Sequence, residues 1–152
     1  MKVEDILKTP QWRSVFETIP TLRTFFANDH ESHGMNSLLA GIWQYLQNML
    51  QHVDNDNPFV WYNLGFNSEL IYALGDTCPV AVESLGVLHS IICDHQISMD
   101  FIDRSHAAAV PADCCSADKL ATGAMHGGLY PKPACTVGIN TPCDAQVMNT
   151  QA

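Results

Sequence analysis

Charged side chains are scarce in this sequence, and Lys and Arg are the scarcest of them. Charged residues make up 15% of the 152 positions, against about 25% in a typical globular domain. Seven Lys and Arg stand against sixteen Asp and Glu, which gives a formal net charge of −9. Such a chain has few cations with which to neutralise nucleic-acid phosphates or to dock on an anionic membrane. We therefore expect neither a nucleic-acid partner nor a membrane partner.

Long apolar runs are also missing. No stretch of the sequence approaches the roughly 18 apolar residues of a membrane-spanning helix. The N-terminus carries charges where a secretory signal would be apolar, so the sequence predicts a cytoplasmic protein. Its six cysteines should then be reduced thiols. They can serve as buried residues, as metal or cluster ligands, or as reactive thiols.

The common chemical motifs are absent. The cysteines form no C-x-x-C pair, so neither a zinc ribbon nor a thioredoxin-type site is supported. The sequence has no G-x-G-x-x-G, Walker A or G-x-S-x-G motif, so nucleotide binding and hydrolase chemistry have no motif support. Histidines are numerous but fall in no ligand pattern, and we interpret His30, His33 and His126 as exposed.

The chain changes character near residue 58. Residues 1–57 are interpreted as a helical N-terminal segment, with an apolar stripe along residues 36–51 and with Pro10 and Pro20 dividing the earlier part into short helices. Residues 58–152 are interpreted as an α/β cluster-binding lobe, with strands near 59–64, 78–82 and 134–139 and helices near 69–74, 84–95 and from 116. This order predicts an α/β fold in which the helical segment precedes a Rossmann-like, mainly parallel sheet.

Ligands of parallel sheets gather at the carboxyl ends of the strands. Cys115 and Cys143 each precede a predicted helix, where free N–H groups and the helix dipole stabilise a thiolate. Although 28 positions separate them, thiols on neighbouring loops of one sheet edge would converge. Spacing alone leaves a second interpretation open, because cysteine is often simply a buried core residue.

Two carboxylates are expected at the same level of the sheet, Glu69 and Glu83. Glu69 is a candidate catalytic residue, or it stabilises the positive end of its own helix. The acidic stretch formed by Asp94 and residues 100–103 is interpreted as a solvated face.

Three segments, taken in order, resemble a known family. They are WYNLGFNSELIYALGDTCPVAVESL at residues 61–85, PADCCSADKLATGAMHGGLYPKP at 111–133 and TVGINTPCDAQVMNTQ at 136–151. An ELIYA strand–helix–strand element, a CS pair before a helix and a PCD after a strand carry the likeness. They resemble the 2-hydroxyacyl-CoA dehydratase / benzoyl-CoA reductase component family, which includes double-cubane-cluster reductases. The likeness covers about the last 90 residues.

The resemblance implies a larger, two-lobed α/β subunit that holds a 4Fe–4S cluster or a double-cubane iron–sulfur cluster through cysteines. Cys115 matches the cysteine of the CS element and Cys143 that of PCD, while Cys114 and Cys78 are further cofactor-binding candidates. Cys93 and Cys135 are interpreted as core residues. The implied partners are an ATP-dependent activator protein, a second family subunit or a self-dimer, and an acyl-CoA-type substrate.

The sequence ends as a helix begins after Cys143, so we expect the front part of a longer protein, in which the cluster is absent or is completed by another subunit. The first hypothesis is an iron–sulfur electron-transfer component, or a truncated fragment of one, of an ATP-activator-dependent reductase or dehydratase acting on 2-hydroxyacyl-CoA or similar hard-to-reduce substrates. The second is a non-catalytic α/β subunit-interaction module with buried structural thiols. The third is a zinc-binding domain that uses Cys114, Cys115, Cys143 and a histidine.

Overall fold

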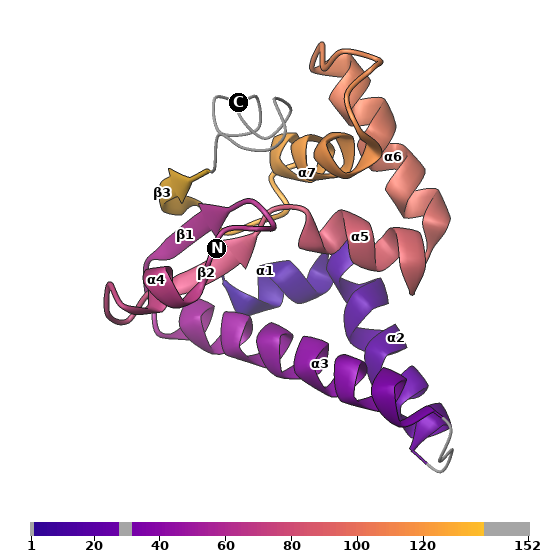
Figure 1. The fold of residues 1–152 in the computed structure, drawn as a ribbon, viewed down its shortest axis with the longest axis vertical. Coiled ribbons are helices and arrows are strands. Elements are labelled where there is room, and N and C mark those ends of the chain that lie inside the picture. Colours follow the sequence, from indigo (N-terminus) through magenta and orange to yellow (C-terminus); the bar gives the residue numbers. More distant parts are fainter. Residues whose placement is uncertain (1, 28–31, 139–152) are drawn as a thin grey trace.

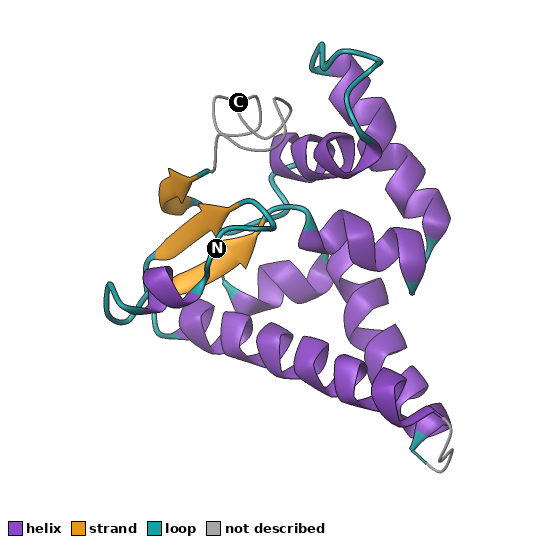
Figure 2. Cartoon of the chain, in the orientation of Figure 1, coloured by secondary structure: helices purple, strands orange, loops and turns teal. Residues whose placement is uncertain are grey.

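The computed structural model describes residues 2–27 and 32–138. Three helices come first: α1 (Val3–Lys8), α2 (Pro10–Phe26) and α3 (His33–Asp54). They are followed by β1 (Phe59–Tyr62), α4 (Glu69–Tyr72), β2 (Cys78–Ala81), α5 (Ser84–Ile91), α6 (His95–Ala107), α7 (Ser116–His126) and β3 (Pro133–Val137) (Figures 1 and 2). The predicted α/β class, with a helical segment before a parallel sheet, is confirmed.

The helices depart from prediction in two places. Helix α2 continues through Pro20 instead of ending there. Proline removes one backbone hydrogen bond. The buried face formed by Trp12, Val15 and Ile19 is continued beyond Pro20 by Leu22 and Phe26, which are partly buried against the core, and this burial offsets the loss. Helix α6 was not expected at all. Its first turn is capped by Asp94, whose side chain accepts a hydrogen bond from the Gln96 backbone N–H at 2.9 Å.

The sheet has three strands in the order β2-β1-β3, and both pairings are parallel. After β1 the chain passes through α4 to β2 on one side, and it then returns through α5, α6 and α7 to β3 on the other side. The direction of strand addition therefore reverses between β1 and β3. Sheets with this 2-1-3 order bind ligands outside the carboxyl ends of the strands at that switch point. The equivalent region here lies beyond Tyr62 and Val137.

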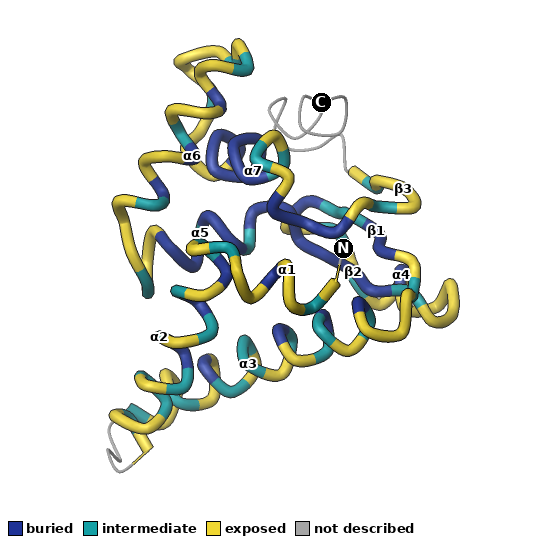
Figure 3. Tube along the Cα trace, turned by 180° about the vertical axis from the view of Figure 1, so that it is seen from behind, coloured by how far each residue is buried: buried dark blue, intermediate teal, exposed yellow. Residues whose placement is uncertain are grey.

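The longer helices form two groups (Figures 1 and 3). Helix α3 contacts β2 and packs against α1 and α2, whereas α5, α6 and α7 pack on one another. One core of buried side chains joins the groups, with contributions from Trp12 of α2, Leu46 of α3, Val80 of β2, Leu85 of α5 and Leu120 of α7. The helical N-terminal segment thus shares its core with the α/β lobe. Within the described residues no helix has both the length and the apolar character needed to cross a membrane.

Two tryptophans hold the connection between α7 and β3. The Trp12 indole N–H donates to the Leu129 carbonyl at 2.6 Å, and the Trp61 indole N–H donates to the Pro131 carbonyl at 3.0 Å. A buried indole N–H that lacks a partner costs free energy, so both contacts favour this path of the chain. The connection is thereby tied to α2 and to the central strand.

Tyr130 lies between these two contacts and links the same connection to the end of β2. Its hydroxyl donates to the Val82 carbonyl at 2.8 Å and accepts from the Leu85 backbone N–H at 3.1 Å. The ring packs edge-on against Trp12 and Trp61, with centroids 5.9 and 6.0 Å apart. The turn from β2 into α5 is therefore fixed by a side chain from a distant part of the sequence.

Helix α7 approaches α6 closely because Gly123 has no side chain. A Cβ placed on Gly123 would lie 2.6 Å from the Phe101 carbonyl carbon and 2.8 Å from its Cα. Backbone atoms of a packed helix cannot yield to such a contact. Helix α7 also packs closely on α5, because a Cβ on Gly86 of α5 would lie 2.5 Å from the Leu120 Cβ. Two glycines thus set the spacing of the α5–α6–α7 group.

We expect Gly123→Ala to lower the free energy of unfolding by about 1–3 kcal/mol or more, because the methyl group forces α6 and α7 apart. The matched control is Gly41→Ala in α3, where the added Cβ meets nothing within 4 Å. Better helix propensity should make that variant more stable by up to about 1 kcal/mol. Urea unfolding followed by far-UV circular dichroism measures both. Equal effects of the two substitutions would contradict the close α6–α7 contact.

Candidate functional site

Two polar side chains are buried where β1 and β2 end. Asn63 follows β1 and is 1% exposed, and Glu83 follows β2 and is 3% exposed. The Asn63 side-chain amide donates to Glu83 Oε1 at 3.2 Å, and the Leu64 backbone N–H donates to Oε2 at 3.0 Å. The Asn63 Oδ1 atom accepts no hydrogen bond from the described residues. A hydrogen-bonded pair of polar side chains is thus buried at the carboxyl edge of the sheet.

The start of α7 adds an acid and a thiol. Asp118 is only 5% exposed, while Cys115, the residue before the helix, is exposed. The Cys115 thiol donates to Asp118 Oδ2 with an Sγ–Oδ2 distance of 2.6 Å. Burial raises the pKa of Glu83, and the negative charge of Asp118 raises it further. We refer to Asn63, Glu83, Asp118 and Cys115 as the carboxyl-edge group.

The expectation that the helix N-terminus makes Cys115 a thiolate is wrong for the protein without a bound metal. Desolvation raises the pKa of the Cys115 thiol above its ordinary value, and the hydrogen bond to Asp118 raises it further. The backbone N–H groups of Ala117 and Asp118 lower that pKa, but their effect is smaller. The side chain is therefore a thiol at neutral pH, with its proton directed at a carboxylate.

The structure does not bring all the candidate cysteines to one edge. Cys115 follows α6, so it lies on a helix–helix connection and not on a strand–helix loop as expected. Cys114, beside it, is half-buried. Cys78 is the buried first residue of β2, so it lies at the opposite, amino edge, and burial raises its pKa to about 12. Cys143 lies outside the described residues.

The remaining predicted residues are placed as follows. Cys135 is exposed on β3 and Cys93 is half-buried after α5, so the interpretation of Cys135 as a core residue is wrong. Glu69 is exposed at the first position of α4, where its backbone N–H donates to Asn67 Oδ1 at 3.1 Å. His33 and His126 are exposed, as predicted, and His30 lies outside the described residues.

Residues 2–27 and 32–138 contain no group of three or more His, Cys, Asp or Glu side chains arranged to hold a metal ion. The carboxyl-edge group by itself is therefore not a metal centre. No family model matches the chain, and neither the curated proteins nor the solved structures contain a match to it.

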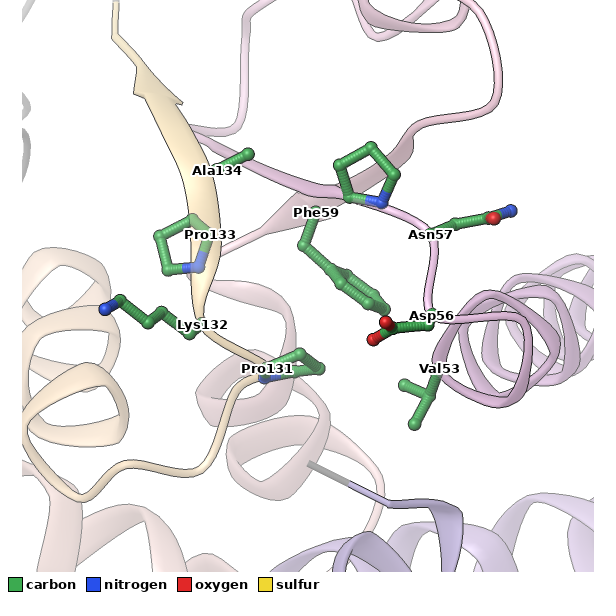
Figure 4. Close-up of a pocket in the computed structure, with 9 residues that line it drawn as sticks. Val53, Asp56, Asn57, Phe59, Pro131, Lys132, Pro133 and Ala134 are labelled. Carbon is green, nitrogen blue, oxygen red and sulfur yellow. The ribbon is translucent and has the colours of Figure 1, made fainter.

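A cavity of about 300 Å³ lies at the opposite edge of the sheet (Figure 4). The end of α3, the loop before β1 and the start of β3 line it, and the Asp56 carboxylate points into it while Lys132 extends away. The cavity opens beside the first residues of β1 and β3, at the amino ends of the strands. It is therefore distinct from the carboxyl-edge group.

Sequence reasoning missed Asp118, and it predicted residues 63–67 at the carboxyl edge without assigning a role to Asn63. Cys115 and Asp118 have the spacing of a capping box, in which a polar residue before the helix pairs with an acidic residue three positions later. That C-x-x-D pattern could have shown that the thiol has a carboxylate neighbour. Nothing comparable marks the role of Asn63, because its partner Glu83 is 20 positions away in the sequence.

Replacing Asp118 by Asn removes the negative charge and the strongest acceptor beside Cys115. We expect the pKa of Cys115 to fall, so that iodoacetamide alkylates this thiol several-fold faster near neutral pH. Peptide mapping by mass spectrometry at a series of pH values measures the rate at Cys115. The control is Asp113→Asn, which removes an exposed carboxylate from the preceding loop. An unchanged rate in Asp118→Asn would exclude the hydrogen bond as a cause.

Glu83 should make stability depend on pH. A carboxyl group whose pKa is raised by folding holds its proton more strongly in the folded state, so stability falls as pH rises from the unfolded value of about 4.3 through the raised one. We expect the unfolding free energy of Glu83→Gln, relative to the original protein, to increase over that range. Denaturant titrations at several pH values measure it, with Glu69→Gln as the control for an exposed carboxylate. If the difference in unfolding free energy between Glu83→Gln and the original protein did not change with pH, the raised pKa of Glu83 would be contradicted.

Proposed function

We propose that this protein is an iron–sulfur electron-transfer component, or a fragment of one, of an ATP-activator-dependent reductase or dehydratase that acts on 2-hydroxyacyl-CoA or similar substrates. The observation that carries the proposal is the exposed Cys115 thiol, which is hydrogen-bonded to the buried carboxylate of Asp118, whose charge in turn raises the pKa of Glu83 at the carboxyl edge of a parallel sheet. Parallel sheets with this strand order bind their ligands at that edge.

The course of β3 supports a second ligand from Cys143. Strand β3 runs parallel to β1 and ends at Val137 at the carboxyl edge. Cys143 follows Val137 by six positions, and six residues of extended chain span at most about 20 Å. The chain length therefore allows Cys143 to come within reach of the edge that carries Asn63 and Glu83.

The donor chemistry is suitable, although the described residues supply only part of a ligand set. Thiolates are the soft ligands that iron–sulfur clusters require, and Cys115 and Cys114 are adjacent donors near the protein surface. A bound cluster would supply the capacity to accept and pass on single electrons. Metal binding requires the Cys115 proton to leave, and Asp118 Oδ2 already accepts a hydrogen bond from that proton. Asp118 is thus placed to take up the proton when sulfur binds iron.

The partners in this proposal are an ATP-hydrolysing activator that delivers the electron, a second subunit of the same family or a second copy, and an acyl-CoA-type substrate. The proposed compartment is the cytoplasm, where thiols stay reduced. A net charge of −9 favours positively charged partner surfaces over anionic ones.

One set of observations favours a second candidate, a non-catalytic α/β subunit-interaction module. Cys78 is buried in the core, and the Cys115 thiol is held in its protonated form by Asp118. In such a module these thiols contribute packing and a local hydrogen bond, and no metal is bound.

Anaerobic purification followed by iron and acid-labile sulfide analysis distinguishes the two candidates. The first predicts a brown protein that contains both elements, with the colour lost in Cys115→Ser and in Cys143→Ser. Cys135→Ser is the matched control, because Cys135 is also exposed but lies on β3, and it should keep the metal. A colourless, iron-free chain favours the interaction module. Retention of iron by both ligand variants would contradict the ligand assignment.

A further inference from the structure

We propose that the connection between β1 and β2 docks a partner protein whose contact surface carries apolar side chains flanked by Lys and Arg. The surface consists of Leu70, Tyr72 and Leu74, and we call it the α4 surface. It does not include the carboxyl-edge group or any cysteine, so the inference is independent of the proposed iron–sulfur function.

Apolar exposure is concentrated on this connection. Leu70, Tyr72 and Leu74 are 59, 49 and 67% exposed. They account for three of the ten large exposed hydrophobic residues found in the described chain, yet they fall within five consecutive positions. A single exposed leucine on a protein surface is ordinary, whereas a local group of apolar side chains marks an interaction site. Figure 3 shows this connection as a largely exposed stretch around α4.

Buried and hydrogen-bonded groups on the inner side of α4 hold the α4 surface in position. Ile71, in the middle of α4, is 1% exposed, and its carbonyl accepts a hydrogen bond from the Thr77 hydroxyl at 2.9 Å. Gly75 closes the turn after α4 with φ +106°, a value that side-chain-bearing residues rarely adopt. The backbone N–H of Leu74, just after the helix, donates to the Ile71 carbonyl at 3.0 Å, so the position of Leu74 next to α4 is fixed as well. A partner therefore meets a preformed apolar surface.

The charge around the α4 surface determines what kind of partner fits. Glu69 and Asp76 are both exposed within the same connection. The sequence contains no Lys or Arg between Thr24 and Asp103, a run of 80 residues. A partner with basic groups at the rim of its apolar contact would be attracted and aligned by these acids.

The same charges disfavour other occupants. A second copy related by a twofold axis would bring the α4 surface against itself, because such interfaces pair the same patch on both subunits. Glu69 and Asp76 would then face like charges. An anionic membrane would meet the same repulsion. The structure therefore favours a basic protein partner.

Two synthetic amphipathic peptides of about 14 residues are suitable probes, with one leucine pattern but with either lysine or glutamate at every polar position. The complete chain is titrated into each fluorescein-labelled peptide, and anisotropy is recorded at about 0.05 M and 0.5 M NaCl. We expect the lysine peptide to bind, more weakly at high salt, and the glutamate peptide not to bind.

The variants test where the peptide binds. Leu70→Ser combined with Leu74→Ser should weaken binding by about tenfold or more, and Glu69→Gln combined with Asp76→Asn should weaken it and reduce its salt dependence. The matched control is Ile91→Ser, which removes a 75% exposed side chain on α5 and should leave binding unchanged. Circular dichroism confirms that each variant is folded.

Three results would overturn the proposal. In the first, the leucine double variant binds the lysine peptide as well as the original protein does. In the second, Ile91→Ser weakens binding to the same extent, so that the interaction is a general one with an acidic surface. In the third, sedimentation shows a dimer of the original protein that the leucine double variant dissociates, which identifies a second copy as the occupant.

Discussion

The hydroxyl group of Tyr130 joins the end of β2 to the start of α5, and the position of the carboxyl edge depends on this contact. It donates to the Val82 carbonyl and accepts from the Leu85 N–H, one of the first-turn groups that have no partner inside their own helix. Glu83 lies between those two residues, so the bridge also fixes the backbone that carries the buried carboxylate. Trp12 and Trp61 pack on the Tyr130 ring, which connects the same point to α2 and to the central strand.

Helix packing, and not a strand end, places the thiol of the carboxyl-edge group. Gly123 allows α7 to lie against the backbone of α6, and the position of α7 determines where Cys115 and Asp118 meet. The four residues of the carboxyl-edge group are therefore positioned in two different ways. Asn63 and Glu83 follow strands and are fixed by sheet register, whereas the thiol and its carboxylate move with a helix. A partner or ligand that shifts α7 would change the surroundings of Glu83 without altering the sheet.

Local patterns in the sequence were sufficient for the fold class and for most elements. The stripe along α3 and the β-branched runs of the strands predicted their elements because periodicity and propensity act over short distances. Pro20 was misjudged because the burial that keeps α2 continuous comes from distant elements. Cys115 was misjudged because desolvation and the hydrogen bond to Asp118 raise the pKa of its thiol by more than the N–H groups at the start of α7 lower it. Cys78 was proposed as a cofactor-binding candidate, but as the first residue of β2 it lies at the amino edge of the sheet, away from Asn63 and Glu83.

The hydrogen bond from Trp12 to Leu129 spans 117 positions of sequence, and this separation has a consequence for biosynthesis. At roughly 5–20 residues per second, a ribosome adds those residues in roughly 6–23 s. During that time α2 is already translated. The Trp12 indole N–H still lacks its acceptor, and the core around α2 still lacks Leu129 and Tyr130. The apolar faces of the nascent N-terminal helices therefore stay partly exposed until almost the whole described chain has been synthesised.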